Sequence, residues 1–223
     1  MTINITPGGH RLDVIPSGPD VRDEAYAWTR LLAPTPPAID FRNLNLTPPI
    51  DDQGAEGSCV GQAVAGDDEI VQRVDGVTEF KPSRSFAYWA ARMADSGTAT
   101  ADVGASIRGG VAGLHKYGIC SESEMAYVVG GYAVQPTGQQ LTDSLPNAIQ
   151  AYRSISQDLN TFRAALAAKL PIIYGFAVYA SFENCGADGI IGPPGGALFG
   201  YHANVLVGYD DATQRISVRN SWG

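Results

Sequence analysis

The hydrophobic pattern of this chain changes period at Pro171, and that change limits the folds that it can adopt. Upstream, apolar residues recur on one helical face in four segments, near residues 58–74, 83–93, 106–117 and 159–170. Downstream come runs rich in β-branched and aromatic residues, at 172–179, 204–209 and 215–220. Helices followed by strands predict an α+β chain with a helical lobe and a sheet lobe. A cleft between two such lobes is a favoured place for a functional site.

The ends of the predicted helices carry recognisable signals. Ser106 is a good N-cap for the third segment, and Gly118 suits its C-terminal end. Pro171 ends the fourth segment, in which Leu159 and Leu170 are expected to face inward.

Residues 1–37 differ in composition from the rest of the chain. They contain Gly8-Gly9, Pro16, Pro19 and the run Ala33-Pro-Thr-Pro-Pro37. Proline at this density stiffens a chain and suits a linker. A short helix is predicted at residues 24–32, and its aromatic and leucine side chains favour docking on the protein body over disorder. We treat residues 1–37 as an N-terminal arm and residues 38–223 as one folded domain.

Charge and composition exclude several classes of function. The net charge of −8 argues against a nucleic-acid partner. No apolar run approaches the roughly 20 residues that cross a bilayer, so no membrane partner is predicted. The first 20 residues show no signal peptide, which leaves secreted and cytoplasmic locations open.

The three cysteines, Cys59, Cys120 and Cys185, cannot complete a disulfide framework. They form no C-x-x-C pair, so neither a structural zinc site nor any other metal or cofactor is predicted. Cys120 and Cys185 have no base beside them and are interpreted as structural thiols.

Residues 51–70 hold six carboxylates and no lysine or arginine. A solvated acidic face is the simpler interpretation. The alternative is a negative rim of the functional site, which would favour cationic substrate segments. Equal activity on peptides with and without basic residues would remove the alternative.

Two inward polar residues are expected on neighbouring predicted strands. Ile216 and Val218 alternate with polar residues, which predicts that both face inward, and Asn220 shares their parity. His202 opens the preceding strand, so the imidazole and the carboxamide could satisfy each other. For a lone histidine, a hydrogen bond to a backbone carbonyl would be the simpler interpretation.

Cys59 lies at a predicted helix start, after a turn that contains glycine. The helix dipole lowers the pKa of a thiol in that position, whereas neighbouring carboxylates raise it. A buried cysteine is usually structural. Here Gly57 and Gly61 flank the thiol and allow other groups to approach it closely, which favours a nucleophile.

Three sequence blocks resemble the motifs of the papain family of cysteine peptidases. They are Gln53-x5-Cys59, Tyr201-His202-Ala203 and Asn220-Ser-Trp-Gly223, in the family's order. His202 lies 143 residues and Asn220 161 residues after Cys59, a spacing compatible with the family. The runs 205–209 and 113–119 also look like the family, and the resemblance extends from about residue 38 to the C-terminus.

The resemblance implies a cysteine endopeptidase that acts on protein or peptide substrates. Cys59 would attack as a thiolate, His202 would act as acid and base, and Asn220 would orient the imidazole. The Gln53 amide and the Cys59 backbone N–H would stabilise the oxyanion.

The resemblance also implies a papain-like two-lobe fold, with a helical lobe at about 55–122 and an antiparallel, barrel-like sheet lobe at about 123–223. Four residues are implied to bind substrate in the cleft between the lobes. Gly104 and Ala105 would pair with the substrate backbone, and Gly175 and Ala203 would line the main specificity pocket. Trp222 would shield the His–Asn hydrogen bond from water.

The sequence departs from the family at several places. Glu56 replaces the usual second cysteine before the nucleophile, Val60 replaces an aromatic residue, and residues 102–110 lack cysteine, so the family's disulfides are absent. These features are similar to the bacterial branch, as is the segment Pro19-Asp-Val-Arg-Asp23. The chain ends at Gly223, within the family's last motif, which suggests truncation or an open sheet edge.

We expect residues 1–37 to act as a propeptide-like arm that covers the cleft, giving a latent enzyme with its own intramolecular inhibitor. A chain beginning at Ile39 that is no more active than the full chain would count against this. Two alternatives remain open: a papain-fold binding module, and an acyltransferase or deamidase with the same Cys–His geometry.

Overall fold

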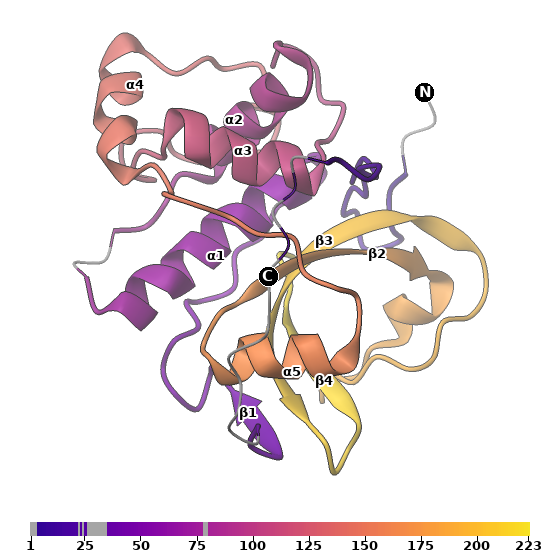
Figure 1. Ribbon diagram of the computed structural model, residues 1–223. Helices are drawn as coiled ribbons and strands as arrows, with labels where there is room; N and C mark the ends of the chain where they lie inside the picture. The colour runs from indigo at the N-terminus through magenta and orange to yellow at the C-terminus, as the bar shows by residue number, and fades with distance from the viewer. Residues whose placement is uncertain (1–3, 22, 24, 26–34, 78–79) are drawn as a thin grey trace.

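The computed structural model describes residues 4–21, 23, 25, 35–77 and 80–223 (Figure 1). The helix predicted at 24–32 lies outside these residues, apart from Ala25, which forms an isolated bridge with Ser154. Helices come first and most strands second, as the hydrophobic period predicts. No helix in the described ranges is long and apolar enough to cross a bilayer.

The helical lobe contains α1 (Cys59–Asp75), α2 (Arg84–Ser96), α3 (Ile107–Tyr117) and α4 (Gly138–Ser144). A 3₁₀ turn, η1 (Leu145–Asn147), follows α4. Figure 1 shows α4 beside α2 and α3, and the Ile119 N–H donates to the Ser144 carbonyl at 3.2 Å. The helical lobe therefore continues beyond residue 122.

Local signals explain where these helices begin and end. The Ser83 hydroxyl accepts a hydrogen bond from the Phe86 N–H at the start of α2, and Ser106 caps α3 through the Gly109 N–H. Gly118 ends α3 with a φ of 67°, a conformation that glycine adopts without strain. The helix starts expected near residues 58, 83 and 106 are thereby confirmed.

The sheet lobe contains β1 (Ala38–Asp40), β2 (Ile172–Tyr179), β3 (Leu198–Asp210) and β4 (Arg215–Arg219), with α5 (Leu159–Ala167) and the 3₁₀ turn η2 (Ala180–Asn184). All the pairings are antiparallel. β1 and β2 pair with successive stretches of one edge of β3, and β4 pairs with the other edge. The described strands form an open sheet, so the predicted fold class holds while "barrel-like" is too strong.

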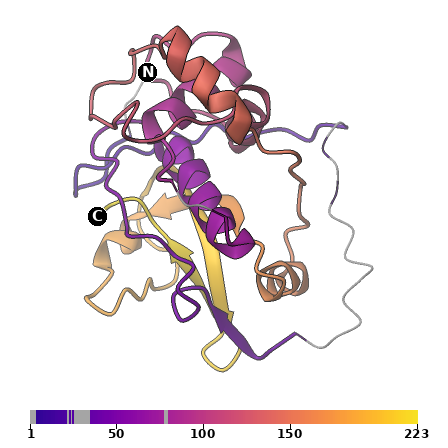
Figure 2. The same ribbon diagram turned by 90° about the vertical axis from the view of Figure 1, so that its left-hand side faces the viewer.

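The core lies where α1 packs between the other helices and the sheet (Figures 1 and 2). Phe86, Ile70 and Val205 are completely buried there. Burial of such side chains contributes roughly 1.5–3 kcal/mol each relative to exposure. Glycine permits a close contact between α2 and α3, because a β-carbon on Gly113 of α3 would lie 2.7 Å from the Ala90 carbonyl oxygen of α2.

Two details of the predicted pattern are wrong. α5 ends at Ala167, and its Leu159 is 66% exposed; Leu170 lies beyond the helix and is 38% exposed. The chain turns instead at Lys169, which adopts a φ of 60°.

The predicted inward face of β4 is also wrong for Ile216, which is 36% exposed, whereas Arg219 is 4% exposed. Arg219 lies against Gly66 of α1 and donates to the Pro49 carbonyl at 2.7 Å. It also lies 3.5 Å from the Asp51 carboxylate. The alternating pattern of β4 predicts that Arg219 faces solvent, but its paired guanidinium is buried.

The acidic stretch 51–70 is not a solvated face. Asp51 pairs with Lys81 at 2.6 Å as well as with Arg219, and Glu56 is 2% exposed. Burial raises the pKa of Asp67 to about 7, helped by its neighbour Asp68. Most of these carboxylates are therefore buried or paired.

Candidate active site

Cys59 is the first residue of α1 and is completely buried. Ser58, at the N-cap, makes no side-chain cap bond; its hydroxyl instead lies 2.7 Å from the Tyr127 hydroxyl. Burial raises the pKa of Cys59 to about 11, while backbone hydrogen bonds from Ala203 and Asp13 act in the opposite direction. The thiol is therefore neutral in this closed arrangement.

His202 lies on β3 and is also completely buried. Its Nε2 lies 2.8 Å from Asn220 Oδ1, so Nε2 carries the proton and donates it. Nδ1 has no hydrogen-bond partner in the described part of the chain. Burial lowers the pKa of His202 to about 4. Because the neighbouring Ala203 backbone bonds the Cys59 thiol, the imidazole and the thiol belong to one site.

Asn220 and Trp222 hold the imidazole from two directions. Asn220 Oδ1 also accepts the Ser221 N–H at 2.8 Å, which fixes the carboxamide. The Trp222 ring lies 4.9 Å from the His202 ring, centroid to centroid, and Phe176 contacts the imidazole edge-on at 5.9 Å. The arm adds His10, which stacks on Trp222 at 4.9 Å.

Gln53 is completely buried and its amide has a fixed orientation. Ser221 Oγ donates to Gln53 Oε1 at 2.8 Å, so Nε2 points the other way. Nε2 donates to the backbone oxygens of Arg11 at 2.9 Å and Glu56 at 3.1 Å. The amide expected to bind an oxyanion thus holds a carbonyl of the arm.

The arm lies between α3 and the strands β2 and β3, as the indigo segment of Figure 1 shows. Val14 forms a parallel bridge with Ala105, and the Ile15 N–H donates to the Ala105 carbonyl at 2.9 Å. On the sheet side, the Val14 N–H donates to the Tyr201 carbonyl at 3.2 Å. The arm is therefore bonded to both lobes beside the buried thiol.

The four residues expected to bind substrate all face this arm or lie next to it. A β-carbon on Gly104 would overlap the Asp13 carbonyl oxygen, at 1.8 Å. Gly175 pairs with Ala203 across β2 and β3, and a β-carbon on Gly175 would lie 3.5 Å from Val14 Cγ1. The arm backbone thus occupies the space left by the missing β-carbon of Gly104, and the Val14 side chain lies where a β-carbon on Gly175 would point.

Several residues at this site escaped the sequence analysis. Arg11 forms an ion pair with Asp102, and Asp102 accepts the Tyr88 hydroxyl at 2.6 Å and the Gly57 N–H at 3.1 Å. These contacts join segments far apart in sequence, so no local pattern signals them. Ser221 could have been found, because it lies within the Asn-Ser-Trp-Gly block.

The remaining thiols differ from each other. Cys120 is completely buried and Cys185 is exposed, and both are free. The structural interpretation is therefore wrong for Cys185, which lies on the surface after η2. In the described ranges, no group of three or more His, Cys, Asp or Glu side chains could hold a metal ion.

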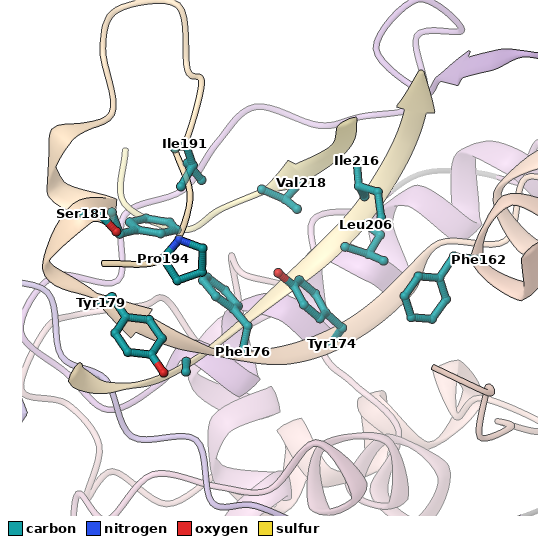
Figure 3. Close-up of a pocket in the computed structure, with 13 residues that line it drawn as sticks. Phe162, Tyr174, Phe176, Tyr179, Ser181, Ile191, Pro194, Leu206, Ile216 and Val218 are labelled. Atoms are coloured by element: carbon teal, nitrogen blue, oxygen red, sulfur yellow. The ribbon is translucent and has the colours of Figure 1, made fainter. Parts of the chain in front are cut away.

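A separate apolar pocket of about 260 Å³ lies on the sheet lobe (Figure 3). Tyr174 and Phe176 stack at 5.2 Å on one wall, and Leu206 and Val218 line another part. Phe176 links the pocket to the imidazole of His202. The pocket contains none of the polar groups of the Cys–His site.

Comparison with known proteins identifies the family to which this fold belongs. Residues 35–223 match the papain family of cysteine proteases, and the chain belongs to that family. An uncharacterized peptidase C1-like protein of Acanthamoeba polyphaga mimivirus is 30% identical over 187 residues, which cover 77% of this chain and 59% of the relative. The chain thus spans less than two thirds of that relative's length.

Solved structures agree with this assignment. Xylellain, a cysteine protease from Xylella fastidiosa, is 33% identical, with a TM-score of 0.84 over 96% of this chain and 85% of its own. A procathepsin B of Trypanosoma congolense is 18% identical, with a TM-score of 0.65 over 90% of this chain and 73% of its own, and shares the fold. The resemblance to the bacterial branch is confirmed by the similarity to xylellain.

Proposed function

We propose that this chain is a latent cysteine endopeptidase that cleaves peptide bonds with Cys59, His202, Asn220 and Gln53. One observation carries the proposal. The Gln53 amide, fixed by Ser221, already donates to a peptide carbonyl, that of Arg11, beside the buried thiol. A peptide carbonyl held in this way is arranged for attack by a neighbouring nucleophile.

In the first step, His202 Nδ1 takes the proton of the Cys59 thiol, and the thiolate attacks the substrate carbonyl carbon. The oxyanion that forms accepts hydrogen bonds from Gln53 Nε2 and the Cys59 backbone N–H. Protonated His202 then gives its proton to the leaving amine, and a thioester with Cys59 remains. Water, deprotonated by His202, hydrolyses the thioester and restores the thiol.

Asn220 is a positioning residue in this scheme. It accepts the Nε2 proton of His202 at 2.8 Å, so the basic lone pair is left on Nδ1. The tautomer needed to receive the thiol proton is thereby selected. Trp222 packs against the same ring and keeps water from competing for the bond.

Burial explains why the closed form is at rest. It raises the pKa of Cys59 to about 11 and lowers the pKa of His202 to about 4, so both groups are neutral. Withdrawal of the arm would hydrate the cleft and reduce this penalty on the charged forms. The thiolate–imidazolium pair would then form more readily, so arm release would both admit substrate and activate the nucleophile.

Arg11 anchors the arm to the body of the protein through an ion pair with Asp102, and it also pairs with Asp13 within the arm. We predict that full-length Arg11→Ala hydrolyses a fluorogenic peptide at least about 10-fold faster than the unchanged chain, because a partly buried ion pair is lost. Arg42→Ala is the matched control, since Arg42 pairs with Asp40 and its side chain is 68% exposed. Equal rates for all three chains would refute the latency.

The chemistry itself is tested in the Arg11→Ala chain. Cys59→Ala should abolish hydrolysis, whereas Cys185→Ala should leave it unchanged because Cys185 is exposed and lies outside the cleft. Hydrolysis that survives Cys59→Ala would exclude this nucleophile. An acyltransferase or deamidase would lose its own activity in Cys59→Ala yet release no peptide fragments in the parent.

A further inference from the structure

We propose that Tyr127 is a positioning residue for the two groups that would stabilise the oxyanion, the Gln53 side-chain amide and the Cys59 backbone N–H. Its hydroxyl bonds both ends of the loop that carries these two donors. The inference rests on the proposed function and deepens it by naming the residue that holds both donors in place.

The loop at residues 53–58 has one donor at each end. Gln53 begins the loop, and the Cys59 N–H belongs to the peptide group that follows Ser58. Ser58 adopts a φ of −89° and a ψ of 10°, which lie outside regular helix geometry. The conformation of Ser58 therefore sets the direction of the Cys59 N–H, and the distance between the donors depends on how the two loop ends are held.

The Tyr127 hydroxyl joins these two ends. It donates to the Gln53 backbone oxygen at 2.7 Å and lies 2.7 Å from Ser58 Oγ. A phenol has one proton, so Ser58 Oγ donates to Tyr127 while Tyr127 donates to Gln53. Ser58 Oγ in turn accepts from Gln62 Nε2 of α1 at 3.5 Å. Each hydroxyl in this chain thus has a defined donor and a defined acceptor.

The segment at residues 127–130 also holds the middle of the loop. The Gly130 N–H donates to Glu56 Oε2 at 2.9 Å, and Glu56 is buried. A β-carbon on Gly54 would lie 2.8 Å from Val129 Cγ2, so the glycine lets the segment pack directly on the loop. The segment therefore contacts the loop at both ends and between them.

Tyr127 is itself held by the body of the protein. Its N–H donates to Glu122 Oε1 at 2.9 Å, and the Arg84 guanidinium lies over its ring, 4.7 Å from the centroid. Arg84 and Glu122 pair with each other at 2.6 Å. Burial raises the pKa of the Tyr127 hydroxyl well above its usual value, so the phenol keeps its proton. A side chain held at its backbone, its ring and its hydroxyl can fix the groups that it bonds.

Tyr127→Phe in the full-length Arg11→Ala chain removes the hydroxyl and keeps the ring. We expect kcat for a fluorogenic peptide to fall about 3- to 10-fold with KM unchanged, the range for loss of one hydrogen bond. Tyr152→Phe is the matched control and should leave kcat unchanged. It removes the same group from a side chain that is 36% exposed and lies against His115.

Two thiol reagents separate positioning of the donors from a general loss of structure. The Cys59 sulfur adds to the carbonyl carbon of a peptidyl aldehyde, the thiol proton passes to His202, and the aldehyde oxygen becomes an oxyanion. The inhibition constant of the aldehyde should therefore rise in Tyr127→Phe by the same factor as kcat falls. Iodoacetamide alkylates the Cys59 sulfur with loss of iodide and forms no oxyanion, so its rate should stay unchanged. A purely structural role would alter the reactions of both reagents or of neither.

Ser58→Ala in the same background tests the other end of the loop. It leaves the hydrogen bond between Tyr127 and Gln53 in place, so the aldehyde inhibition constant should rise by about 3-fold, the lower part of the same range. Thermal unfolding checks that both variants fold.

Unchanged aldehyde inhibition in folded Tyr127→Phe would overturn the inference and leave the proposed function standing. An iodoacetamide rate that falls as far as kcat would do the same. If Tyr127→Phe does not fold, unchanged aldehyde inhibition in Ser58→Ala decides against the inference. An Arg11→Ala parent that cleaves no peptide, and in which neither reagent reacts with Cys59, would overturn the proposed function and this inference together.

Discussion

At the scale of single residues, the site depends on side chains that hold other side chains. Ser221 fixes Gln53, and Asn220 fixes His202, each through one hydrogen bond of 2.8 Å. Both come from the block that ends the chain. The sequence predicts Gln53, His202 and Asn220 as members of one site, and the structure brings them together.

Ser221 is expected to matter through Gln53. In the Arg11→Ala background, Ser221→Ala should lower kcat by about 10-fold with little change in KM, because the amide loses its fixed orientation. Gln53→Ala removes the donor itself and should cost about 100-fold or more. Steady-state kinetics on one peptide measure both effects. An unchanged kcat in folded Ser221→Ala would show that the amide needs no such support.

At the scale of elements, α1 joins the two lobes and carries both the nucleophile and a buried acid. Its N-terminus presents Cys59, and further along Asp67 has a buried oxygen with no hydrogen-bond partner among the described residues. Hydrophobic periodicity predicts a helix near residues 58–74. It cannot predict that the carboxyl stays buried, because that depends on what packs against the helix.

Asp67 gives α1 a pH-dependent stability. Burial raises its pKa from 3.8 to about 7, so the unfolded chain releases this proton at lower pH than the folded chain. The stability that the protonated Asp67 carboxyl contributes to the folded chain is fully present below about pH 4 and is lost as the pH rises through 7. Asp67→Asn should therefore raise the free energy of unfolding by at least about 1 kcal/mol at pH 8, with a gain that shrinks toward pH 4.

Denaturant unfolding at several pH values measures this gain. Asp75→Asn on the same helix is the control, because Asp75 is exposed. A gain for Asp67→Asn that is the same at pH 4 and pH 8 would mean that titration of Asp67 does not underlie it.

At the scale of the whole molecule, the contacts hardest to predict are those between distant segments. The Ser106 cap and the helix end at Gly118 are local, and the sequence predicts them, as it predicts a helix that starts near residue 83. The Arg11–Asp102 ion pair joins residues 91 positions apart, and Arg219 crosses from β4 to the loop before α1. Such pairs depend on how the lobes and the arm meet, which periodicity does not encode.

The arm is the feature on which the proposed latency depends. Its described residues place a carbonyl on Gln53, a guanidinium on Asp102 and a valine beside Gly175. It thus contacts the oxyanion amide, the acidic residue and the predicted specificity pocket together. The alternative of a catalytically idle binding module gives no reason for an arm to fill all three.

The rate at which a peptidyl epoxide labels Cys59 in the full-length chain tests this account most directly. Mass mapping should find the adduct on Cys59, formed slowly in the unchanged chain and at least about 10-fold faster in Arg11→Ala, whereas Arg42→Ala should match the unchanged chain. An adduct that never forms on Cys59, or that forms equally fast with and without Arg11, would contradict the account.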